Sequence, residues 1–375
     1  MKILFTGGGT GGHFYPIVAV AEEIKKQVVE NKLVEAELYF MSPTPYNAGI
    51  LYERGIRFIP VAAGKQRTYF SILNFFDLFK TGWGIVTALW KVFNLYPDVI
   101  FSKGGYTSFP VLVAARILRI PVVIHESDSV PGKVNQWSGK FAARIAVSFP
   151  DAAAYFPKDR VALTGNPVRT EIALRSTEGA REFFSLEPNI PVILVLGGSQ
   201  GSKIINDSMT DALPELLKKY QVLHQSGKNN FVEAKETADV VLLNDDNKPR
   251  YHLVDYFNTV ALRHAAGSAD LVISRAGSTI FEIAAWGLPS IIIPIRESRN
   301  DHQAKNAYAY ARAGACQVVE EMNLTSNILA AEVSRILDNV ELRGKMAEAA
   351  KAFFRPRAAE AIALEILKIA AQHGG

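Results

Sequence analysis

The strongest constraint on the fold lies at the start of the chain, where a short apolar strand runs straight into a glycine-rich turn. The strand, residues 2–6, is followed by Gly7-Gly-Gly-Thr-Gly-Gly-His13, and a helical pattern of apolar residues begins at Phe14. Glycine permits positive φ and close approach of a ligand to the backbone, and the N–H groups that begin a helix bind anions. The pattern predicts a turn that cradles a phosphate or a sugar diphosphate, with the titratable His13 beside it. A tight turn without a ligand is the alternative.

Apolar strands alternate with helical patterns through the first half of the chain. The expected strands are residues 2–6, 36–41, 56–61, 98–102, 121–125, 144–147 and 161–164. Helical patterns lie between them, for example over residues 108–118. This alternation predicts an α/β fold with a parallel, doubly wound sheet.

The alternation stops at Thr164-Gly-Asn-Pro-Val-Arg169 and then restarts. The second set of expected strands is residues 191–196, 220–224, 252–254, 271–274, 290–294 and 315–319. A second glycine turn, Gly197-Gly-Ser-Gln-Gly-Ser202, follows the first of these strands. Both glycine turns then lie at the carboxyl ends of their sheets, where ligands of such folds bind. A cleft between two Rossmann-like halves is the expected site.

The length of the chain also indicates two domains, because 375 residues exceed what a single hydrophobic core usually holds. We expect an N-terminal domain of residues 1–168 and a C-terminal domain of residues 169–355. The helical pattern over residues 358–371 is expected to cross back, so that residues 356–375 complete the N-terminal domain.

The composition disfavours several classes of protein. A net charge of +4 is too small to indicate a nucleic-acid binder. The single cysteine, Cys316, cannot form an internal disulfide and suits a reducing compartment. The first residues contain no signal-peptide core, and no run of 18 apolar residues indicates a spanning helix. We therefore expect a soluble or surface-bound protein.

The first glycine turn does not have the surroundings of a nicotinamide-dinucleotide site. Gly7, Gly9 and Gly12 satisfy the pattern G-x-G-x-x-G, which by itself is a weak indication. A dinucleotide site also needs an acidic residue at the end of the second strand to bind the ribose. That strand ends in Tyr39-Phe-Met-Ser42, so the sequence disfavours a dehydrogenase.

A nucleotide site is better supported in the second half of the chain. Ser274-Arg-Ala-Gly-Ser278 ends a strand and leads into a helix that carries Glu282 in its first turn. Backbone donors at the start of this helix suit a phosphate, and the Glu282 carboxylate can accept hydrogen bonds from two ribose hydroxyls. Alternatively, Glu282 only supplies favourable negative charge at a helix N-terminus.

Taken together, the motifs resemble those of the MurG family of cell-wall N-acetylglucosaminyltransferases, in the family's order and over nearly the whole chain. They are residues 7–13, Gly104-Gly-Tyr106, His125-Glu126, Pro131-Gly132 with Asn135, residues 165–169, 197–201 and 274–277, Glu282 and Asp301-His-Gln303. The resemblance implies a GT-B fold and an inverting transfer of N-acetylglucosamine from UDP-GlcNAc to undecaprenyl-linked lipid I, which forms lipid II. It also implies no metal, no other cofactor, and a peripheral place on the cytoplasmic face of the cell membrane.

The resemblance also assigns substrate-binding roles. The first domain would hold the donor sugar and diphosphate through Thr10, Gly11 and Gly12, with Asp128 and Asn135 on the sugar side. The diphosphate contacts would be Arg169, Ser199 and Gln200, and Phe257 would flank the uracil. Phosphate and ribose would be held by Ser278, Thr279 and Glu282. Gln303 would contact the GlcNAc hydroxyls, with His302 beside it at the helix start.

The chain departs from the family pattern at two places. Asp128 stands where most members have Asn, and an ionised Asp accepts hydrogen bonds but cannot donate them. The segment from Arg275 to Glu282 is one residue shorter than the family's Arg-x-Gly-x-x-Thr-x-x-Glu, which shifts the turn at Ser278 and Thr279.

The reaction needs a base, because a sugar hydroxyl is a poor nucleophile near neutral pH. His13 has a suitable intrinsic pKa and lies on the glycine turn. Glu126 is the rival base, and the alternative role for His13 is to hydrogen-bond the loop. No Asp-x-Asp pair follows a strand, and Asp245-Asp246 lies in a polar turn. Arg169 and the helix N-termini would therefore stabilise the charge on the leaving UDP.

A stretch rich in Trp and Phe suggests a membrane contact. Residues 69–93 include Phe75, Phe76 and Phe79, and Lys65, Arg67, Lys80 and Lys91 lie in or beside them. Gly82 and Gly84 interrupt the stretch, and its charges exclude a spanning helix. We expect an interfacial patch on the cytoplasmic membrane, and a helix pair packed on the first sheet is the alternative.

Two further functions fit the same motifs. One is a glycosyltransferase with another lipid acceptor, such as a glycolipid synthase. The other is a nucleotide-sugar-binding protein without activity, which the joint presence of His13 and Glu282 disfavours.

Overall fold

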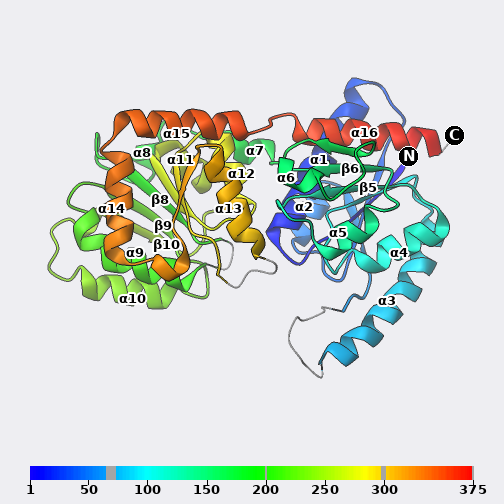
Figure 1. The fold of residues 1–375 in the computed structure, drawn as a ribbon, viewed down its shortest axis with the longest axis horizontal. Helices are drawn as coiled ribbons and strands as arrows, with labels where there is room; N and C mark the ends of the chain where they lie inside the picture. Colours follow the sequence, from blue (N-terminus) through cyan, green and yellow to red (C-terminus); the bar gives the residue numbers. More distant parts are fainter. Residues whose placement is uncertain (65–72, 199–200, 297–300, 374–375) are drawn as a thin grey trace. The chain divides into compact units, whose positions relative to one another are not determined.

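A computed structural model of the chain describes all residues except 65–72, 199–200, 297–300 and 374–375, and side chains are not described for residues 73–76. The chain divides into two compact units (Figure 1). The first comprises Met1–Arg169 and Arg355–Gly375, and the second comprises Thr170–Phe354. Each contains a parallel sheet, so the predicted α/β class and the two Rossmann-like domains are confirmed.

The first unit is built on a seven-stranded parallel sheet in the order β3-β2-β1-β4-β5-β6-β7. Its strands are β1 (Lys2–Thr6), β2 (Glu37–Ser42), β3 (Ile56–Pro60), β4 (Val99–Ser102), β5 (Val122–Glu126), β6 (Arg144–Val147) and β7 (Val161–Leu163). Its helices are α1 (Gly11–Glu30), α2 (Ala48–Glu53), α3 (Leu73–Leu95), α4 (Phe109–Leu118), α5 (Lys133–Ser138), α6 (Pro150–Ala153) and α16 (Ala358–His373).

The central strand β1 shows why this sheet needs helices on both faces. Ile3 and Phe5 point to one face, where they pack with side chains of α1 and α16. Leu4 points to the other face, where it packs with side chains of α3 and α4. Successive side chains of a strand alternate between faces, so a continuously apolar strand is stable only when both faces are covered.

The second unit is built on a six-stranded parallel sheet in the order β10-β9-β8-β11-β12-β13. Its strands are β8 (Val192–Leu196), β9 (Gln221–Gln225), β10 (Tyr251–Val254), β11 (Leu271–Ser274), β12 (Ser290–Ile292) and β13 (Cys316–Val318). Its helices are α7 (Thr170–Ala173), α8 (Ala180–Phe183), α9 (Lys203–Leu216), α10 (Phe231–Val241), α11 (Thr259–Ser268), α12 (Thr279–Trp286), α13 (His302–Arg312), α14 (Ser326–Leu337) and α15 (Val340–Phe353), with the short 3-10 turns η1 (Lys248–Arg250) and η3 (Glu321–Asn323).

Short polar side chains define the starts of several helices. Asn47, Ser202, Asn258, Thr325 and Asn339 precede α2, α9, α11, α14 and α15, and each accepts a hydrogen bond from the backbone N–H three residues later. Such a cap satisfies one of the four N–H groups that a helix leaves unpaired. These residues therefore fix where the chain turns from a loop into a helix.

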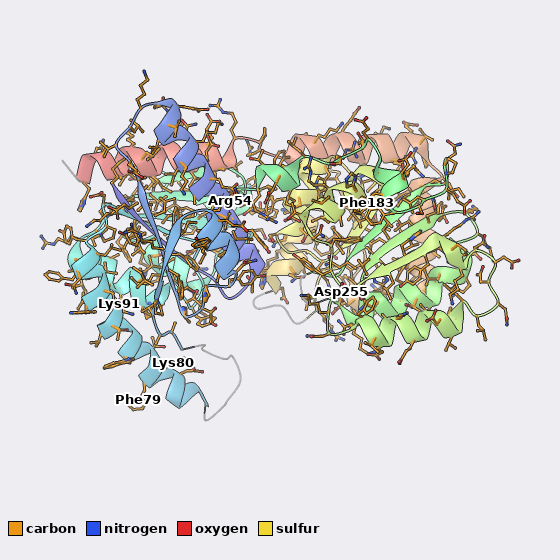
Figure 2. All side chains as sticks on the ribbon, turned by 180° about the vertical axis from the view of Figure 1, so that it is seen from behind. Arg54, Phe79, Lys80, Lys91, Phe183 and Asp255 are labelled. Carbon is orange, nitrogen blue, oxygen red and sulfur yellow. The ribbon has the colours of Figure 1, made fainter. Side chains whose placement is uncertain are left out.

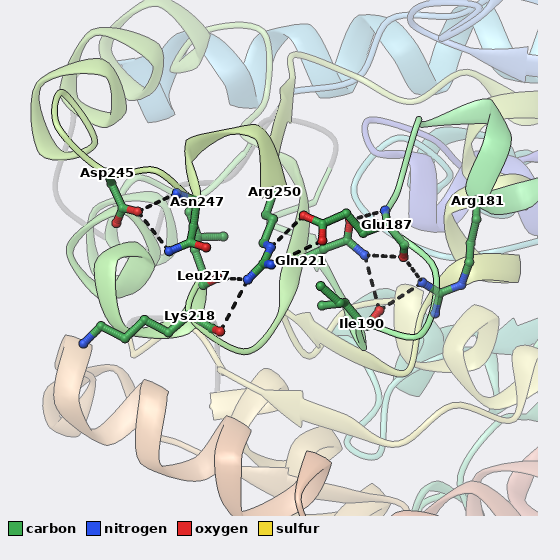
Figure 3. Close-up of polar contacts among 9 residues, drawn as sticks. All are labelled: Arg181, Glu187, Ile190, Leu217, Lys218, Gln221, Asp245, Asn247 and Arg250. Atoms are coloured by element: carbon green, nitrogen blue, oxygen red, sulfur yellow. Dashed lines mark hydrogen bonds and ion pairs between the residues drawn. The ribbon is translucent and has the colours of Figure 1, made fainter.

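Side chains also join the turns at the edge of the second sheet (Figure 3). Arg250 donates from Nε and Nη2 to the two carboxylate oxygens of Glu187, at 2.8 and 3.2 Å, and from Nη1 to the carbonyl of Leu217 at 2.8 Å. Gln221 donates to the carbonyl of Glu187 at 3.1 Å. The bidentate arrangement is the strong geometry for an Arg–carboxylate pair, and it ties the segment before β8 to the end of α9.

One predicted helix boundary is wrong, and the alternative of a helix pair in the aromatic stretch is wrong as well. The first helix begins at Gly11, three residues before the predicted Phe14, because Thr10 is extended (φ −147°) and its carbonyl accepts hydrogen bonds from the backbone N–H groups of His13 and Phe14. In the aromatic stretch, α3 continues through Gly82 and Gly84. It is one helix rather than a pair, because the penalty of about 1 kcal/mol per glycine is small beside the packing of a long helix.

The last helix, α16, belongs to the first unit. Ile362 and Ile366 of α16 pack in the same cluster as Val20 and Ile24 of α1. Figure 1 shows α3 running out beyond the rest of this unit at its N-terminal end. Within the described parts of the chain, no helix is long and apolar enough to cross a membrane.

Candidate functional site

Each sheet has one point at which the strand order reverses, and a glycine turn lies at each. In the first unit the reversal falls between β1 and β4, and in the second between β8 and β11. The helices that follow two such strands leave in opposite directions, so a crevice opens at the carboxyl ends of the strands and commonly binds a ligand. The sequence-predicted site residues therefore fall into two groups, one at each reversal.

The first glycine turn packs closely against the end of β4. Gly7 has φ +138°, and a Cβ atom on it would lie 2.9 Å from the Cβ of Lys103. Only glycine accepts both that φ and that separation. The exposed Thr10 and the half-buried Gly11 and Gly12 then lead into α1, so their backbone N–H groups belong to a helix start.

His13 lies in the first turn of α1 with its ring oriented by the glycine turn. Its Nδ1 is 3.2 Å from the carbonyl oxygen of Gly8. A carbonyl only accepts, so Nδ1 carries the proton of the neutral ring and Nε2 carries the lone pair. The ring also lies against Gly105, where an added Cβ would come within 3.3 Å of His13 Cε1. This is the tautomer that a general base acting through Nε2 requires.

A buried lysine and histidine lie beside this turn. Lys103, which is 1% exposed, places Nζ 2.5 Å from Nδ1 of the fully buried His125. On its other side His125 places Nε2 3.0 Å from the carbonyl oxygen of Gly165, so Nε2 carries the proton and Nδ1 accepts from the lysine. Burial and then the charge of Lys103 hold the pKa of His125 well below its usual value. His125 is therefore a neutral link between β5 and two neighbouring segments.

Glu126, at the end of β5, anchors the loop that follows it. One carboxylate oxygen accepts from the backbone N–H of Asp128 at 2.9 Å. The other accepts from the N–H of Gly132 at 3.0 Å and from Nδ2 of Asn135 at 2.9 Å. The pKa of Glu126 is raised to about 7, mainly by burial and then by the negative charge of Asp128, while the three hydrogen bonds oppose both effects. Asp128 is half-buried and Asn135 is buried, and both lie on the loop and helix held by this carboxylate.

Arg169 lies close to the first glycine turn rather than in the second unit. Its guanidinium carbon is 4.1 Å from the centre of the Tyr15 ring, a distance at which a cation and an aromatic face attract each other. Tyr15 and Tyr46 meet edge to face, and a Cβ on Gly11 would come within 2.9 Å of the Tyr46 hydroxyl. An aromatic and cationic surface therefore borders the start of α1.

The second glycine turn is tighter still. Gly201 has φ +77°, and an added Cβ would lie 1.9 Å from the carbonyl oxygen of Ser226. Ser202 follows as the N-cap of α9 and accepts from the N–H of Ile205 at 3.4 Å. Ser199 and Gln200, two of the predicted diphosphate contacts, lie outside the described residues.

Arg275 connects the parts of this second site. Its Nη2 lies 2.6 Å from both the Ser202 hydroxyl and the Glu321 carboxylate, and its Nη1 donates to the carbonyl of Ile293 at 3.1 Å. Burial lowers the pKa of Arg275, and the hydrogen bond and charge of Glu321 oppose that shift. The guanidinium therefore binds the start of α9 to the strand ends beside it.

The remaining predicted donor contacts lie around the same edge of the second sheet. Ser278 and Thr279 begin α12, and Glu282 lies in its first turn. Gln303, in the first turn of α13, accepts from the N–H of Ile295 at 3.1 Å, and His302 begins that helix. Phe257 is 3% exposed and meets Phe184 edge to face. Its contact with a uracil, like the other substrate roles, stays a prediction.

The described residues contain no group of three or more His, Cys, Asp or Glu side chains that could hold a metal ion. Asp245, of the acidic pair in the polar turn, accepts from the backbone and side-chain nitrogens of Asn247 at 2.8 and 3.2 Å (Figure 3). This carboxylate therefore closes its own turn. Independence from metal stays a prediction.

Sequence reasoning missed Lys103 and Tyr46. Lys103 could have been found, because it follows a predicted strand directly and precedes the Gly104-Gly-Tyr106 motif at the sheet edge that carries the first glycine turn. Tyr46 gave no comparable signal. It reaches the site from a loop between β2 and α2 in which its backbone has φ +56°, a conformation that its residue type does not predict.

Known proteins match the chain along most of its length. Models of the glycosyltransferase family 28 N-terminal and C-terminal domains match residues 3–147 and 192–362. The chain is 37% identical over 344 residues to the UDP-N-acetylglucosamine–N-acetylmuramyl-(pentapeptide) pyrophosphoryl-undecaprenol N-acetylglucosamine transferase 2 of Bacillus cereus, over 91% of this chain and 93% of that protein.

Solved structures share the fold. The crystal structure of MurG from Acinetobacter baumannii superposes with a TM-score of 0.73 at 24% identity, over 98% of this chain and 99% of that one. The UDP-GlcNAc 2-epimerase from Neisseria meningitidis, solved with UDP-GlcNAc bound, superposes with a TM-score of 0.71 at 16% identity, over 98% and 100%. Since the second is named an epimerase, the shared fold alone does not decide the reaction.

Proposed function

Because the chain belongs to the family of UDP-N-acetylglucosamine–N-acetylmuramyl-(pentapeptide) pyrophosphoryl-undecaprenol N-acetylglucosamine transferases, we propose that it transfers N-acetylglucosamine from UDP-GlcNAc to lipid I and so forms lipid II. The observation that carries the chemistry is the orientation of His13. Its Nδ1 faces the Gly8 carbonyl, so in the neutral ring Nε2 carries the basic lone pair.

The proposed reaction is a single displacement that inverts the anomeric carbon. An acceptor hydroxyl attacks that carbon, its proton passes to Nε2 of His13, and the bond between the carbon and the UDP oxygen breaks. Glu126 is the weaker candidate for the base, because its carboxylate already accepts three N–H groups of the loop that it anchors. Its role in this proposal is to hold Asp128 and Asn135 in place.

The leaving UDP carries developing negative charge, for which the proposal assigns three stabilising groups. The N-terminal N–H groups of α9 and α12 follow the two strands at the reversal of the second sheet, and helix N-termini favour anions. Arg169 supplies a cation beside the first glycine turn. Preorganised donors of this kind are usually the largest single contribution to catalysis.

We also propose that α3 docks on a membrane surface and presents the enzyme to its lipid acceptor. Phe79, Trp83 and Trp90 are 64, 66 and 67% exposed. With the exposed Val86 and Phe93 they recur at steps of four and three residues, so they share one helix face. The opposite face, including Ala88 and Val92, packs into the core with α4.

Cations accompany this apolar face of α3. Figure 2 shows Lys80 beside Phe79 near one end of the helix and Lys91 nearer the other. An amphipathic helix with Trp and Phe on one side and Lys beside them is typical of segments that lie in a membrane interface. Of the other residues predicted for this patch, Lys65 and Arg67 lie outside the described residues, and the side chains of Phe75 and Phe76 are not described.

A transfer assay with two acceptors tests the function. The purified protein is incubated with radiolabelled UDP-GlcNAc and either a lipid I analogue or diacylglycerol in detergent micelles. The proposal requires label to move onto the lipid I analogue only. Transfer to diacylglycerol would identify a glycolipid synthase instead, and UDP-GlcNAc binding without transfer to either acceptor would identify a binding protein.

A further inference from the structure

Gln225 places a buried amide at the edge of the second sheet that carries the glycine turn. It is the last residue of β9, so it lies at the carboxyl end of its strand, and it is 6% exposed. A buried amide needs hydrogen-bond partners within the protein, because an unpaired donor or acceptor away from water is costly. The partners of Gln225 therefore show which segments it joins.

Both partners of the Gln225 amide are backbone groups. Its Nε2 donates to the carbonyl of Gly198 at 3.3 Å, and its Oε1 accepts from the backbone N–H of Phe257 at 2.9 Å. A carbonyl only accepts and a backbone N–H only donates, so these two bonds fix which end of the amide is nitrogen and which is oxygen. One side chain therefore ties the second glycine turn to the segment that carries Phe257.

The bond to Phe257 begins where the pairing of the two strand ends stops. The backbone N–H groups of residues 226 and 227 donate to the carbonyls of Val254 and Asp255 at 3.0 and 3.1 Å, which extends the contact of β9 with β10 by two residues. The next link between the two segments is the bond from the Phe257 N–H to Gln225. Gln225 therefore holds this segment at the point where it leaves the sheet.

We propose that Gln225 is a positioning residue that sets the spacing between the two parts of the donor site, the glycine turn for the diphosphate and the Phe257 segment for the uracil. This inference rests on the proposed function, which requires a UDP-sugar donor. Gln225 acts through the backbone of both segments and touches no part of the nucleotide. UDP must contact both segments at once, so holding them at a fixed spacing lowers the entropy cost of binding.

Gln221 offers a matched control, because it makes the same kind of contacts at the amino end of the same strand. It is 1% exposed, and its Oε1 accepts from the backbone N–H of Glu187 at 2.7 Å. Its Nε2 donates to the carbonyls of Glu187 and Ile190 at 3.1 and 3.3 Å (Figure 3). Ligands of such sheets bind at the carboxyl ends of the strands, so loss of the Gln221 amide removes comparable bonds away from the donor site.

The test compares Gln225→Met with Gln221→Met, since methionine keeps the side-chain length and removes the amide. Gln225→Met should raise the dissociation constant of UDP, measured by calorimetry, and the KM for UDP-GlcNAc by about tenfold, the size expected for two lost hydrogen bonds. At saturating donor, kcat should change by less than about threefold, because the loss concerns ground-state binding. Gln221→Met should lower the melting temperature by a similar amount and leave the dissociation constant of UDP unchanged.

Uridine distinguishes a role at both segments from a role at Phe257 alone. It lacks the diphosphate, so its affinity, measured by ligand-observed NMR, should fall in Gln225→Met by only about threefold, as for one lost hydrogen bond. Equal losses for uridine and UDP would mean that Gln225 supports the uracil side only, and would overturn the proposal.

Hydrogen exchange at the Phe257 N–H provides a readout that needs no nucleotide. Exchange there should speed up in Gln225→Met and stay unchanged in Gln221→Met. Parent-like UDP affinity in Gln225→Met, or an equal loss of UDP affinity in Gln221→Met, would overturn the proposal. A parent protein that binds no UDP would instead overturn the proposed function, and this inference with it. If Gln225→Met does not fold, Gln225→Asn, whose shorter side chain cannot span both segments, takes its place with the same expected results.

Discussion

The points at which the strand order reverses in the two sheets have the same architecture but carry different kinds of side chain. Around the first, the side chains are titratable: they lie at the ends of β4 and β5, on the loops that follow, or in the first turn of α1, and are Lys103, His125, Glu126, Asp128 and His13. Around the second, the groups next to the glycine turn are serine hydroxyls, backbone N–H groups and one arginine that pairs with a glutamate. Repeating a fold therefore does not repeat a function.

The difference separates two tasks that one glycosyl transfer requires. Moving a proton needs a titratable group such as His13, and the buried groups beside it at the first reversal, Lys103 and Glu126, have pKa values shifted to about 8 and about 7. Holding a nucleotide diphosphate needs preorganised donors whose charge does not change, which helix starts and a paired arginine supply at the second. The comparison predicts that variants at the first reversal alter turnover and that variants at the second alter donor affinity.

The largest effect is expected at the first reversal. His13→Ala removes the proposed base and should lower kcat roughly 10²–10⁴-fold, the usual contribution of general-base catalysis. The dissociation constant for UDP, measured by calorimetry, should change little. His373→Ala, an exposed histidine of the same unit, is the control. Near-normal turnover of His13→Ala would make Glu126 the candidate base.

A smaller effect of a different kind is expected at the second reversal. Glu282→Ala should weaken UDP binding by about 1.5–3 kcal/mol, the range for hydrogen bonds to a charged group. The exposed Glu348 of α15 provides the control variant. Replacing the ribose of the donor with 2′-deoxyribose should weaken binding less in Glu282→Ala than in the parent protein. Equal losses on both would show that Glu282 does not touch the ribose.

A third variant tests the proposed membrane contact of α3 in the first unit. Replacing Phe79, Trp83 and Trp90 with Ser should lower the partition onto anionic vesicles by roughly tenfold or more. Each substitution removes an aromatic ring whose apolar area the membrane interface would bury. Activity on a short-chain soluble acceptor should stay intact. Sedimentation with vesicles measures the partition.

The matched control for that variant replaces Val29, Val34 and Tyr52 with Ser. These residues are also exposed and apolar, and they belong to the same unit but not to α3. Equal loss of vesicle binding in both variants would remove any special role of α3. Unchanged binding in the α3 variant would do the same.

No effect at all is expected from chelation. If helix starts and Arg169 stabilise the leaving diphosphate, EDTA in metal-free buffer should leave the transfer rate unchanged within error. An absolute requirement for Mg²⁺ or Mn²⁺ would break the assignment of charge stabilisation to fixed donors.

The sequence predicted the order and type of the sheet elements well. Every predicted strand is present, and its ends differ by at most two residues from the observed ones. Strands such as residues 192–196 are buried on both faces and appear in the sequence as unbroken apolar runs that lead into a glycine turn, which is a strong local signal. Helix boundaries were harder: glycine propensity alone could not show that Gly11 lies inside a helix or that α3 passes through two glycines.

The sequence predicted only those parts of the candidate site whose residues are contiguous in one segment. The glycine turns and His13 are contiguous in sequence, so their proximity could be inferred. The ion cluster at the first reversal joins residues about 20 positions apart on two strands, and its pairing depends on strand order and burial. No local pattern shows that Lys103 faces His125, or that Arg169 stacks on Tyr15 rather than lying in the second unit.

The return of α16 to the first unit has a consequence for how the protein is made. Ile362 and Ile366 complete a core whose other members lie mostly before residue 150, so that core cannot close until the ribosome has passed residue 366. The second unit is continuous, from Thr170 to Phe354, and can fold as it emerges. During synthesis the apolar side of α1 therefore stays uncovered until α16 is made. Loss of α16 should destabilise the first unit, although most of its residues are synthesised first, and should leave the second unit stable.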